Sequence, residues 1–292
     1  MIFKNYNILL QKVIIRKADI TNKNIKQIYH QYSNTIVMQN AMKMTNDILK
    51  FQQECFKHYL NDIREKIIEF PEKYLFPDGN PILPILPVKT EKKKIMFVGA
   101  FPSARFENRN GLLIPTANNL SPFGKEEYFD GQQIRKQASR EVLEEEFFSN
   151  LNINADEHWI TDLVKVYLMP EKHIKNCIQI NPNIKYVDTH KLLKRIAIAS
   201  KEWFYREVEI CKPRLIITFG EVVARVIKSD FNTENRELLN GQIKQTKILG
   251  TDYNICHLPH PEIVRRNKEW QDNNSIIMSR LSQEIKKILN KK

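Results

Sequence analysis

The sequence predicts an α/β fold: a three-layer α/β/α sandwich with a central four-stranded, mainly parallel sheet, plus a helical extension at the N-terminus. Three observations lead to this prediction. Short apolar runs rich in β-branched and aromatic residues, such as 95–99 and 215–219, are typical of buried parallel strands. Both runs meet a glycine at their carboxyl end, which marks a tight turn. Segments of helical periodicity separate the strands, and this alternation favours a parallel sheet covered on both faces.

The N-terminal part, residues 1–90, is predicted to be a helical extension that ends in a Pro-rich connection. Between residues 34 and 70 the apolar positions recur every three or four residues, as in one or two amphipathic helices. Prolines then interrupt this pattern from Pro71 to Pro87. The segment 76–87 is too apolar for a free linker, so we expect it to lie on the following domain.

The rest of the chain, residues 91–292, is predicted to be one domain. Its strands are expected at 95–99, 158–164, 215–219 and 253–258. Its helices are expected at 132–150, at 188–211, after Gly220, and along a terminal segment with Ile277, Leu281, Ile285 and Ile288 on one face. The stretch 100–131 follows neither periodicity. We expect a long ordered loop there, of the kind that usually carries function.

Composition and charge favour a globular protein with a polyanionic partner and disfavour a membrane protein. With 292 residues and 42% hydrophobic content, the chain can bury a sizeable core. The formal net charge of +12, from 46 Lys and Arg, favours a polyanionic partner, although a Lys-rich composition bias would give the same excess. No run of about eighteen apolar residues and no signal-peptide pattern is present, so a cytoplasmic protein without a membrane partner is expected.

The four cysteines are expected to be reduced and mostly buried. They form no C-x-x-C pair and no metal-ligand spacing. A metal site on Cys256, His257 and His260 is the alternative, but no further ligand set is recognisable. No metal and no cofactor is therefore predicted.

The loop Gly99-Ala100-Phe101-Pro102 is the first candidate for an active site. It directly follows a predicted buried strand, and open α/β sheets bind their ligands at the carboxyl ends of the strands. The same edge of the sheet should carry Asp162, at the end of the second strand, and His260, after the fourth. The topology thus predicts that Phe101, Asp162 and His260 meet in one crevice.

Four segments in this order, 95–105, 160–165, 212–225 and 258–266, resemble the uracil-DNA glycosylase superfamily, particularly its thermostable bacterial branch. Members of that branch carry a Gly-x-x-Pro loop, an Ile-Thr-Asn strand, a strand–Gly–helix element and a His-Pro loop. The resemblance covers roughly residues 93–290 and implies a DNA glycosylase that flips a base out of DNA and hydrolyses its N-glycosidic bond. The branch also holds an iron–sulfur cluster on four cysteines that include a closely spaced pair. This chain lacks such a pair, so we expect no cluster.

The resemblance implies roles for individual residues. His260 corresponds to the histidine that lies near the base's carbonyl oxygen, where a hydrogen bond strengthens as negative charge develops. Phe129 or Phe123 would stack on the base. Val264 would be an apolar wedge in the space left by the flipped base, unless this segment is an ordinary cationic helix start. The other expected contacts are Gly99, Ala100 and Phe101 with the base, and Ser103, Arg105, Arg265, Arg266 and Lys268 with the DNA.

The sequence departs from the family pattern in the first loop. Other branches place a carboxylate or amide there to position water, whereas this chain has Ala100 and Phe101. Three alternatives remain: catalysis by electrostatic stabilisation alone, another acid such as Asp130 or Glu107, or an inactive protein.

The second departure is Asp162, where the thermostable branch has Asn. An ionised carboxylate only accepts hydrogen bonds, so it suits the exocyclic amine of cytosine better than the O4 of uracil. A cytosine reader must spare ordinary cytosine. A C5-modified cytosine, such as those of some phage genomes, is therefore the predicted substrate, which suggests antiviral defence. Alternatively, Asp162 caps the chain or pairs with a base such as Lys165.

Two other functions stay open. One is a glycosylase that repairs uracil or another deaminated base. The other is a catalytically silent nucleic-acid-binding module of the same fold. The extension 1–90 is interpreted as scaffold, with a DNA-facing lobe or a partner-binding element as alternatives, and the sequence does not identify any protein partner.

Overall fold

The computed structural model describes residues 46–290, so the first half of the predicted N-terminal extension lies outside the described residues. The chain divides into two units, residues 1–53 and 54–292, and the features below belong to the second. The helix α3 (Asn46–Lys66) runs across this division and is one of the helices that the periodicity between 34 and 70 predicts.

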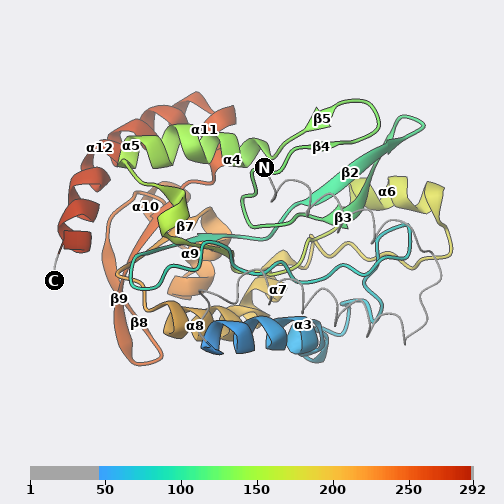
Figure 1. Cartoon of the computed structure of the whole chain (residues 1–292), viewed down its shortest axis with the longest axis horizontal. Coiled ribbons are helices and arrows are strands. Elements are labelled where there is room, and N and C mark those ends of the chain that lie inside the picture. Colours follow the sequence, from blue (N-terminus) through green and yellow to red (C-terminus); the bar gives the residue numbers. More distant parts are fainter. Residues whose placement is uncertain (1–45, 291–292) are drawn as a thin grey trace. The chain divides into compact units, whose positions relative to one another are not determined.

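A five-stranded sheet in the order β6-β1-β7-β9-β8 forms the centre of the fold (Figure 1). The four expected strands are parallel to one another: β1 (Ile95–Gly99), β6 (Trp159–Asp162), β7 (Leu215–Phe219) and β9 (Thr251–Leu258). The predicted α/β class with a mainly parallel sheet is confirmed. A fifth strand, β8 (Lys244–Ile248), adds to β9 in antiparallel orientation, so the sheet has one strand more than predicted. Its sequence, Lys-Gln-Thr-Lys-Ile, is mostly polar because an edge strand is partly solvated, and it therefore carries no apolar signal.

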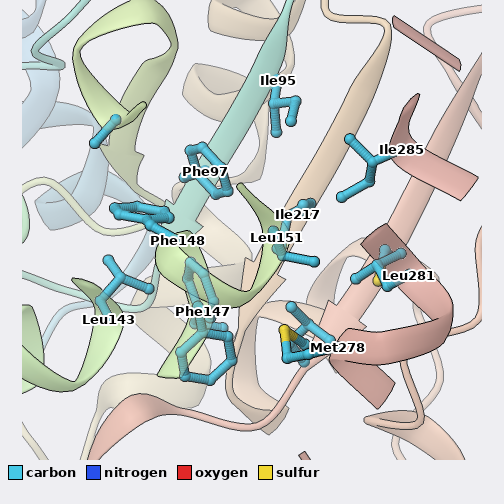
Figure 2. Packing of buried hydrophobic residues seen from close by; sticks show 14 of the residues in the cluster. Ile95, Phe97, Leu143, Phe147, Phe148, Leu151, Ile217, Met278, Leu281 and Ile285 are labelled. Atoms are coloured by element: carbon cyan, nitrogen blue, oxygen red, sulfur yellow. The ribbon is translucent and has the colours of Figure 1, made fainter. Parts of the chain in front are cut away.

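Helices cover both faces of the sheet (Figure 1). On one face, Phe97 and Ile217 of the sheet pack with Phe147, Phe148 and Leu281 in a single apolar cluster (Figure 2). These helical residues belong to the segment α4–η1–α5 (Ala138–Val142, Leu143–Phe148, Ser149–Leu151) and to α12 (Lys268–Asn290).

The opposite face of the sheet turns toward α8 (Lys201–Cys211) and the C-terminal part of α3. Trp159 of β6 donates a hydrogen bond to Glu207 of α8, and the ring of Tyr59 on α3 meets Trp203 of α8 edge-on at 5.8 Å. Neighbouring residues of a strand point to opposite faces, so Ile160 joins the apolar cluster while Trp159 reaches α8. The remaining helical elements are η2 (Ala155–Glu157), α6 (Glu171–Ile180), α7 (Leu193–Ala199), α9 (Glu221–Lys228), α10 (Asn235–Leu238) and α11 (Pro261–Arg266).

The Pro-rich connection lies on the sheet domain, as expected. Ile82 and Ile85 are buried, and the main-chain N–H of Ile85 donates to the carbonyl oxygen of Lys165 at 2.6 Å. Val88 then forms an isolated β-bridge with Ile160. The connection is therefore part of the domain that carries the site.

The prediction of an irregular loop over 100–131 is wrong in its first half. Residues 104–118 form the hairpin β2 (Ala104–Arg109) and β3 (Leu112–Asn118). Its turn, Asn110-Gly111, has φ values of 53° and 81°, as a tight two-residue hairpin requires, and this dipeptide is the signal that sequence analysis overlooked. A second, shorter hairpin joins β4 (Tyr128–Phe129) and β5 (Ile134–Arg135).

Within the described part of the chain, no helix is long and apolar enough to cross a membrane. The four cysteines are buried and free. Among residues 46–290, no three His, Cys, Asp or Glu side chains come together as metal ligands.

Candidate active site

Asp162 and Gly99 lie side by side where the two parallel strands β6 and β1 end. The close contact depends on glycine. A Cβ atom at Gly99 would stand 2.1 Å from Oδ1 of Asp162 and 2.7 Å from Cε2 of Phe123, and both distances are too short for real atoms. Gly99 thus allows the carboxyl of Asp162 and the ring of Phe123 to share one place. Sequence analysis expected both residues in the base pocket, and the structure brings them together.

The ring of Phe123 is held on several sides. It meets Phe219 of β7 edge-on at 5.7 Å, and its carbonyl oxygen accepts a hydrogen bond from Nη1 of Arg140 at 3.1 Å. Phe123 adopts a left-handed backbone conformation with φ of 47°, which is uncommon for an aromatic residue. The backbone conformation and the packing both fix the ring beside Asp162.

Asp162 is only 3% exposed, and among residues 46–290 no group donates a hydrogen bond to its Oδ2 atom. The pKa of this carboxyl is raised to about 7, mainly by burial; the positive charge of Lys165 opposes the rise and the negative charge of Glu207 adds to it. A buried polar atom without a partner is rare in folded proteins. Asp162 therefore has hydrogen-bonding capacity that the described residues do not use.

The alternative role of Asp162 as the partner of Lys165 does not match the geometry. The Lys165 ammonium forms its ion pair with Glu207 at 2.5 Å and donates to the main-chain oxygen of Asp162, not to its carboxylate. This network was not predicted from the sequence. The signal was a lysine inside the apolar run Leu163-Val164-Lys165-Val166, because a charge in such a run needs a buried partner.

His260 follows β9 and is the N-cap of α11. Its Nδ1 atom accepts a hydrogen bond from the main-chain N–H of Glu262 at 3.2 Å, so the proton of the neutral ring sits on Nε2. Burial lowers the pKa of His260, which favours this neutral form. The side chain is therefore prepared as an N–H donor through Nε2.

Gly220, directly after β7, lies next to His260. A Cβ atom at Gly220 would lie 3.4 Å from the Cβ of His260, and the φ of 88° at this position also favours glycine. His257 lies on β9 itself, with Nδ1 2.7 Å from the hydroxyl of Thr218 on β7. Its hydrogen bond is to a neighbouring strand, and burial lowers its pKa to about 4.

Asp162 and His260 belong to strands separated by β1 and β7. Three inter-strand spacings put their backbones roughly 14 Å apart along one sheet edge. Phe101 is on the same edge, with its ring edge-on to His190 at 5.6 Å. The main-chain oxygens of Gly99 and Ala100 accept hydrogen bonds from Leu163 and Val164, which ties the first loop to the segment after β6.

Phe129 lies elsewhere. It stands on the β4–β5 hairpin opposite Ile134, and its side chain is 67% exposed. Phe123, not Phe129, is the aromatic residue beside Asp162. Sequence spacing could not decide between them, because both follow Gly99 in a stretch without regular periodicity.

Neither candidate for a replacement acid is available. Asp130 is fully buried, and its carboxylate accepts hydrogen bonds from the main chain of Gln132 and Gln133 and from Arg135. These bonds lower its pKa to about 2, so it is a structural anion of the hairpin turn. Glu107 is paired with Arg109 on the same strand.

The wedge role predicted for Val264 does not fit its position. Helix α11 starts at Pro261, so residues 261 and 264 share its inner face, and Val264 is 1% exposed in the core. Ile263, 40% exposed, is the apolar side chain on the outer surface. Arg265 and Arg266 are also exposed, and both pair with Glu262.

The remaining DNA-contact candidates lie apart from α11 or at its end. Lys268 pairs with Asp272 at the start of α12. Ser103 accepts a hydrogen bond from Asn119. Arg105 is 8% exposed, with its guanidinium 5.3 Å from the ring centre of Tyr128. Arg105 therefore packs against the β4–β5 hairpin and does not extend into solvent as a phosphate contact would.

A family model described as the uracil DNA glycosylase superfamily matches residues 87–282. The chain belongs to this superfamily. The matched region contains every segment of the site, from the Gly99 loop to α11. No curated protein matches the sequence. Membership in the uracil DNA glycosylase superfamily supports a DNA glycosylase-type function and DNA as the binding partner.

Proposed function

We propose that this protein is a DNA glycosylase that flips a base out of DNA and hydrolyses its N-glycosidic bond. The observation that carries the proposal is the buried carboxyl of Asp162, whose Oδ2 has no partner among the described residues and whose Oδ1 lies beside the ring of Phe123 at Gly99. A flat heterocycle could form a hydrogen bond with the Asp162 carboxyl through its edge and stack on the Phe123 ring through its face. The proposal assigns the base edge to Asp162 and the base face to Phe123, whose ring is 4% exposed and would present to the base the side that borders Gly99 and Asp162.

His260 would act on the other side of the base. As the C1′–N bond breaks, its electron pair moves to the base and the sugar becomes oxocarbenium-like. The Nε2–H of His260 would donate to the carbonyl oxygen where this negative charge accumulates. Water then adds to C1′ and its proton passes, directly or through solvent, to the departed base anion, which leaves an abasic site and the free base.

No carboxylate in the first loop is needed to start this reaction. Asp130 and Glu107 are held in other contacts, so the proposal relies on stabilisation of the departing base and not on a general base for water. The same lack of a general base favours a second candidate function, a binding module of this fold without catalysis. Base release distinguishes the two.

The proposed substrate is a cytosine-type base with a substituent at C5. The ionised form of Asp162 accepts from the exocyclic amine of cytosine, and a C5 substituent would separate the target from ordinary cytosine. Hypermodified phage DNA contains such bases, so antiviral defence is the proposed setting. A uracil-type base is the competing substrate. It is favoured by the pKa of about 7, because the protonated form of Asp162 can donate to a carbonyl oxygen.

The decisive experiment is mass spectrometry of the bases released from three DNAs: ordinary cellular DNA, uracil-containing DNA and phage DNA with C5-modified cytosines. Release of the modified cytosine alone supports the proposed substrate. Release of uracil assigns the protein to repair of deaminated bases. Binding to all three DNAs without an abasic site in any of them would leave the silent module as the function.

A further inference from the structure

A buried ion pair lies directly behind Asp162. Lys165 comes from the segment after β6 and Glu207 from α8, both side chains are fully buried, and their charged atoms are 2.5 Å apart. Two polar side chains of β6 complete the network: Thr161 accepts from Lys165 at 2.5 Å, and Trp159 donates to Glu207 at 2.6 Å.

Every donor of the Lys165 ammonium has a partner. Its three hydrogen bonds go to Glu207, to Thr161 and, at 2.6 Å, to the main-chain oxygen of Asp162. Lys165 thus fixes the backbone from which the Asp162 side chain projects. Buried ion pairs are often no more stabilising than well-packed apolar residues of similar volume. Stability alone therefore does not account for this pair, and its position next to the recognition residue needs a reason of its own.

Three titratable groups interact with Asp162 on this side: Lys165 and Glu207, which form the ion pair, and Tyr59 of α3. Cys55 of α3 interacts with the ion pair. Tyr59 and Cys55 stay neutral at physiological pH because burial raises the pKa of each well above its ordinary value. On the opposite side, β1 and the loop present Gly99 and Phe123, which do not titrate. The charge state of Asp162 is therefore set by its own burial and by the Lys165/Glu207 pair.

We propose that the Lys165/Glu207 pair is a positioning element that holds Asp162 in place and sets whether its carboxyl is charged, so that the pair determines which base edge the site accepts. This inference rests on the proposed function, in which Asp162 reads the base. Lys165 favours the carboxylate, which accepts from an exocyclic amine. Glu207 offsets that effect and permits the protonated form, which donates to a carbonyl oxygen.

Two single substitutions test the pair with opposite expected results. Glu207→Gln keeps the size of the side chain but leaves the Lys165 charge uncompensated. The midpoint of the Asp162 titration should move down by about one pH unit, and release of a carbonyl-edged base at pH 7 should fall about fivefold, because the protonated fraction of Asp162 falls from about one half to about one eleventh. Lys165→Met removes the positive charge, and the midpoint should move up by about one unit. Trp159→Phe removes a hydrogen bond to Glu207 without changing a charge, so it is the matched control and should move the midpoint much less.

The protonation of Asp162 can be followed without an activity measurement, through the pH dependence of stability. The free energy of unfolding is measured against pH for each variant and for the same variant with Asp162→Asn, and the difference reports the proton on Asp162. The double variant Lys165→Met/Glu207→Leu, which leaves no unpaired buried charge, provides a folded comparison where a single variant fails to fold. Its midpoint should also rise, because only the burial of Asp162 remains.

Opposite shifts in the two single variants, or the upward shift in the double variant where a single one is unfolded, support the inference. Shifts of one sign in both, or no shift in any folded variant, overturn it and leave the pair a structural contact. The proposed function fails separately, when the wild-type protein releases no base from any DNA although the titration shifts as expected.

Discussion

At the scale of single residues, two side chains divide the chemistry of the site between them. Asp162 is buried and its Oδ2 has no partner among residues 46–290, and His260 has its Nδ1 occupied by the main chain of Glu262. The first is suited to recognising a ligand and the second to donating one hydrogen bond in a known direction. Substitutions at the two positions should therefore have different effects, one on the rate and the other on the choice of base.

Replacement of His260 by Ala should lower base release by about two orders of magnitude or more, as loss of one donor to a developing oxyanion commonly does. The variant also loses the N-cap of α11, which costs about 1 kcal/mol of stability. Rates are compared under single-turnover conditions, with thermal melts to show that the protein is folded. A rate close to that of the wild type would remove His260 from the mechanism.

Replacement of Asp162 by Asn should weaken recognition of a cytosine-type base by about 1–3 kcal/mol and introduce or raise release of uracil, because the amide both donates and accepts. Asp162→Ala should lose the first activity without the second. Matched oligonucleotides carrying uracil, cytosine and C5-modified cytosine measure the order of preference. If the wild type releases uracil efficiently and Asp162→Asn leaves that order unchanged, the cytosine-type substrate is wrong.

At the scale of the secondary-structure elements, the site depends on how closely β1, β6 and the Phe123 segment approach one another. Gly99 is the point of contact, because a single methyl group there overlaps both Asp162 and Phe123. Helix α11 contributes a different kind of surface, since its outer side carries exposed cations and one exposed apolar side chain.

Gly99→Ala should therefore remove most of the activity and destabilise the fold by about 1–3 kcal/mol, as overpacking of a tight site does. Gly250→Ala is the control. Gly250 has a φ of 84° in the turn between β8 and β9 and no atom within 4 Å, so the substitution strains the backbone away from the site. Its activity should stay at the wild-type level, while urea denaturation shows a comparable loss of stability. Full activity in Gly99→Ala would contradict the packed arrangement of the site.

The double variant Arg265→Ala/Arg266→Ala should bind DNA more weakly and with a shallower salt dependence, by up to about two in the slope of log K against log salt. Lys286→Ala/Lys287→Ala on α12 changes the net charge equally and should leave the slope nearly unchanged. Titrations of fluorescent duplex DNA at several salt concentrations measure both. Equal slopes for the two double variants would assign the α11 cations to solubility.

At the scale of the whole molecule, the buried carboxyl of Asp162 makes stability depend on pH. Its pKa is near 7 in the folded state against 3.8 ordinarily, so the folded protein holds this proton more tightly than the unfolded chain. The stabilisation from that proton is fully present below about pH 4 and is lost as pH rises toward 7.

Asp162→Asn should accordingly be more stable than the wild type at pH 8, by up to about 4 kcal/mol, with a small difference near pH 4. Urea denaturation of the two proteins across this pH range gives the difference in their free energies of unfolding. The contributions of the other titrating groups are the same in both proteins and therefore cancel. A stability difference that is independent of pH would mean that the pKa of Asp162 is the same in the folded and the unfolded protein, which would contradict the raised pKa.

The sequence by itself determined the four parallel strands, most of the helices between them and the edge where Asp162, Phe101 and His260 lie; it did not predict α6, between β6 and β7, or the short α10, between β7 and β9. These features follow from local apolar periodicity and from the rule that parallel strands end on one side. The Gly-x-x-Pro loop and the His-Pro loop also placed the chain in its superfamily before any geometry was known.

Only the tertiary structure decided which aromatic ring joins the site, that Val264 is buried, and that the Lys165/Glu207 ion pair lies beside Asp162. Phe123 and Phe129 look alike in sequence, but a left-handed backbone turns one toward Gly99 while a hairpin exposes the other. Glu207 lies 42 positions after Lys165, and nothing local connects them. The physical reason is that burial and electrostatics depend on distances between segments that are remote in the chain, and local periodicity carries no information about those distances.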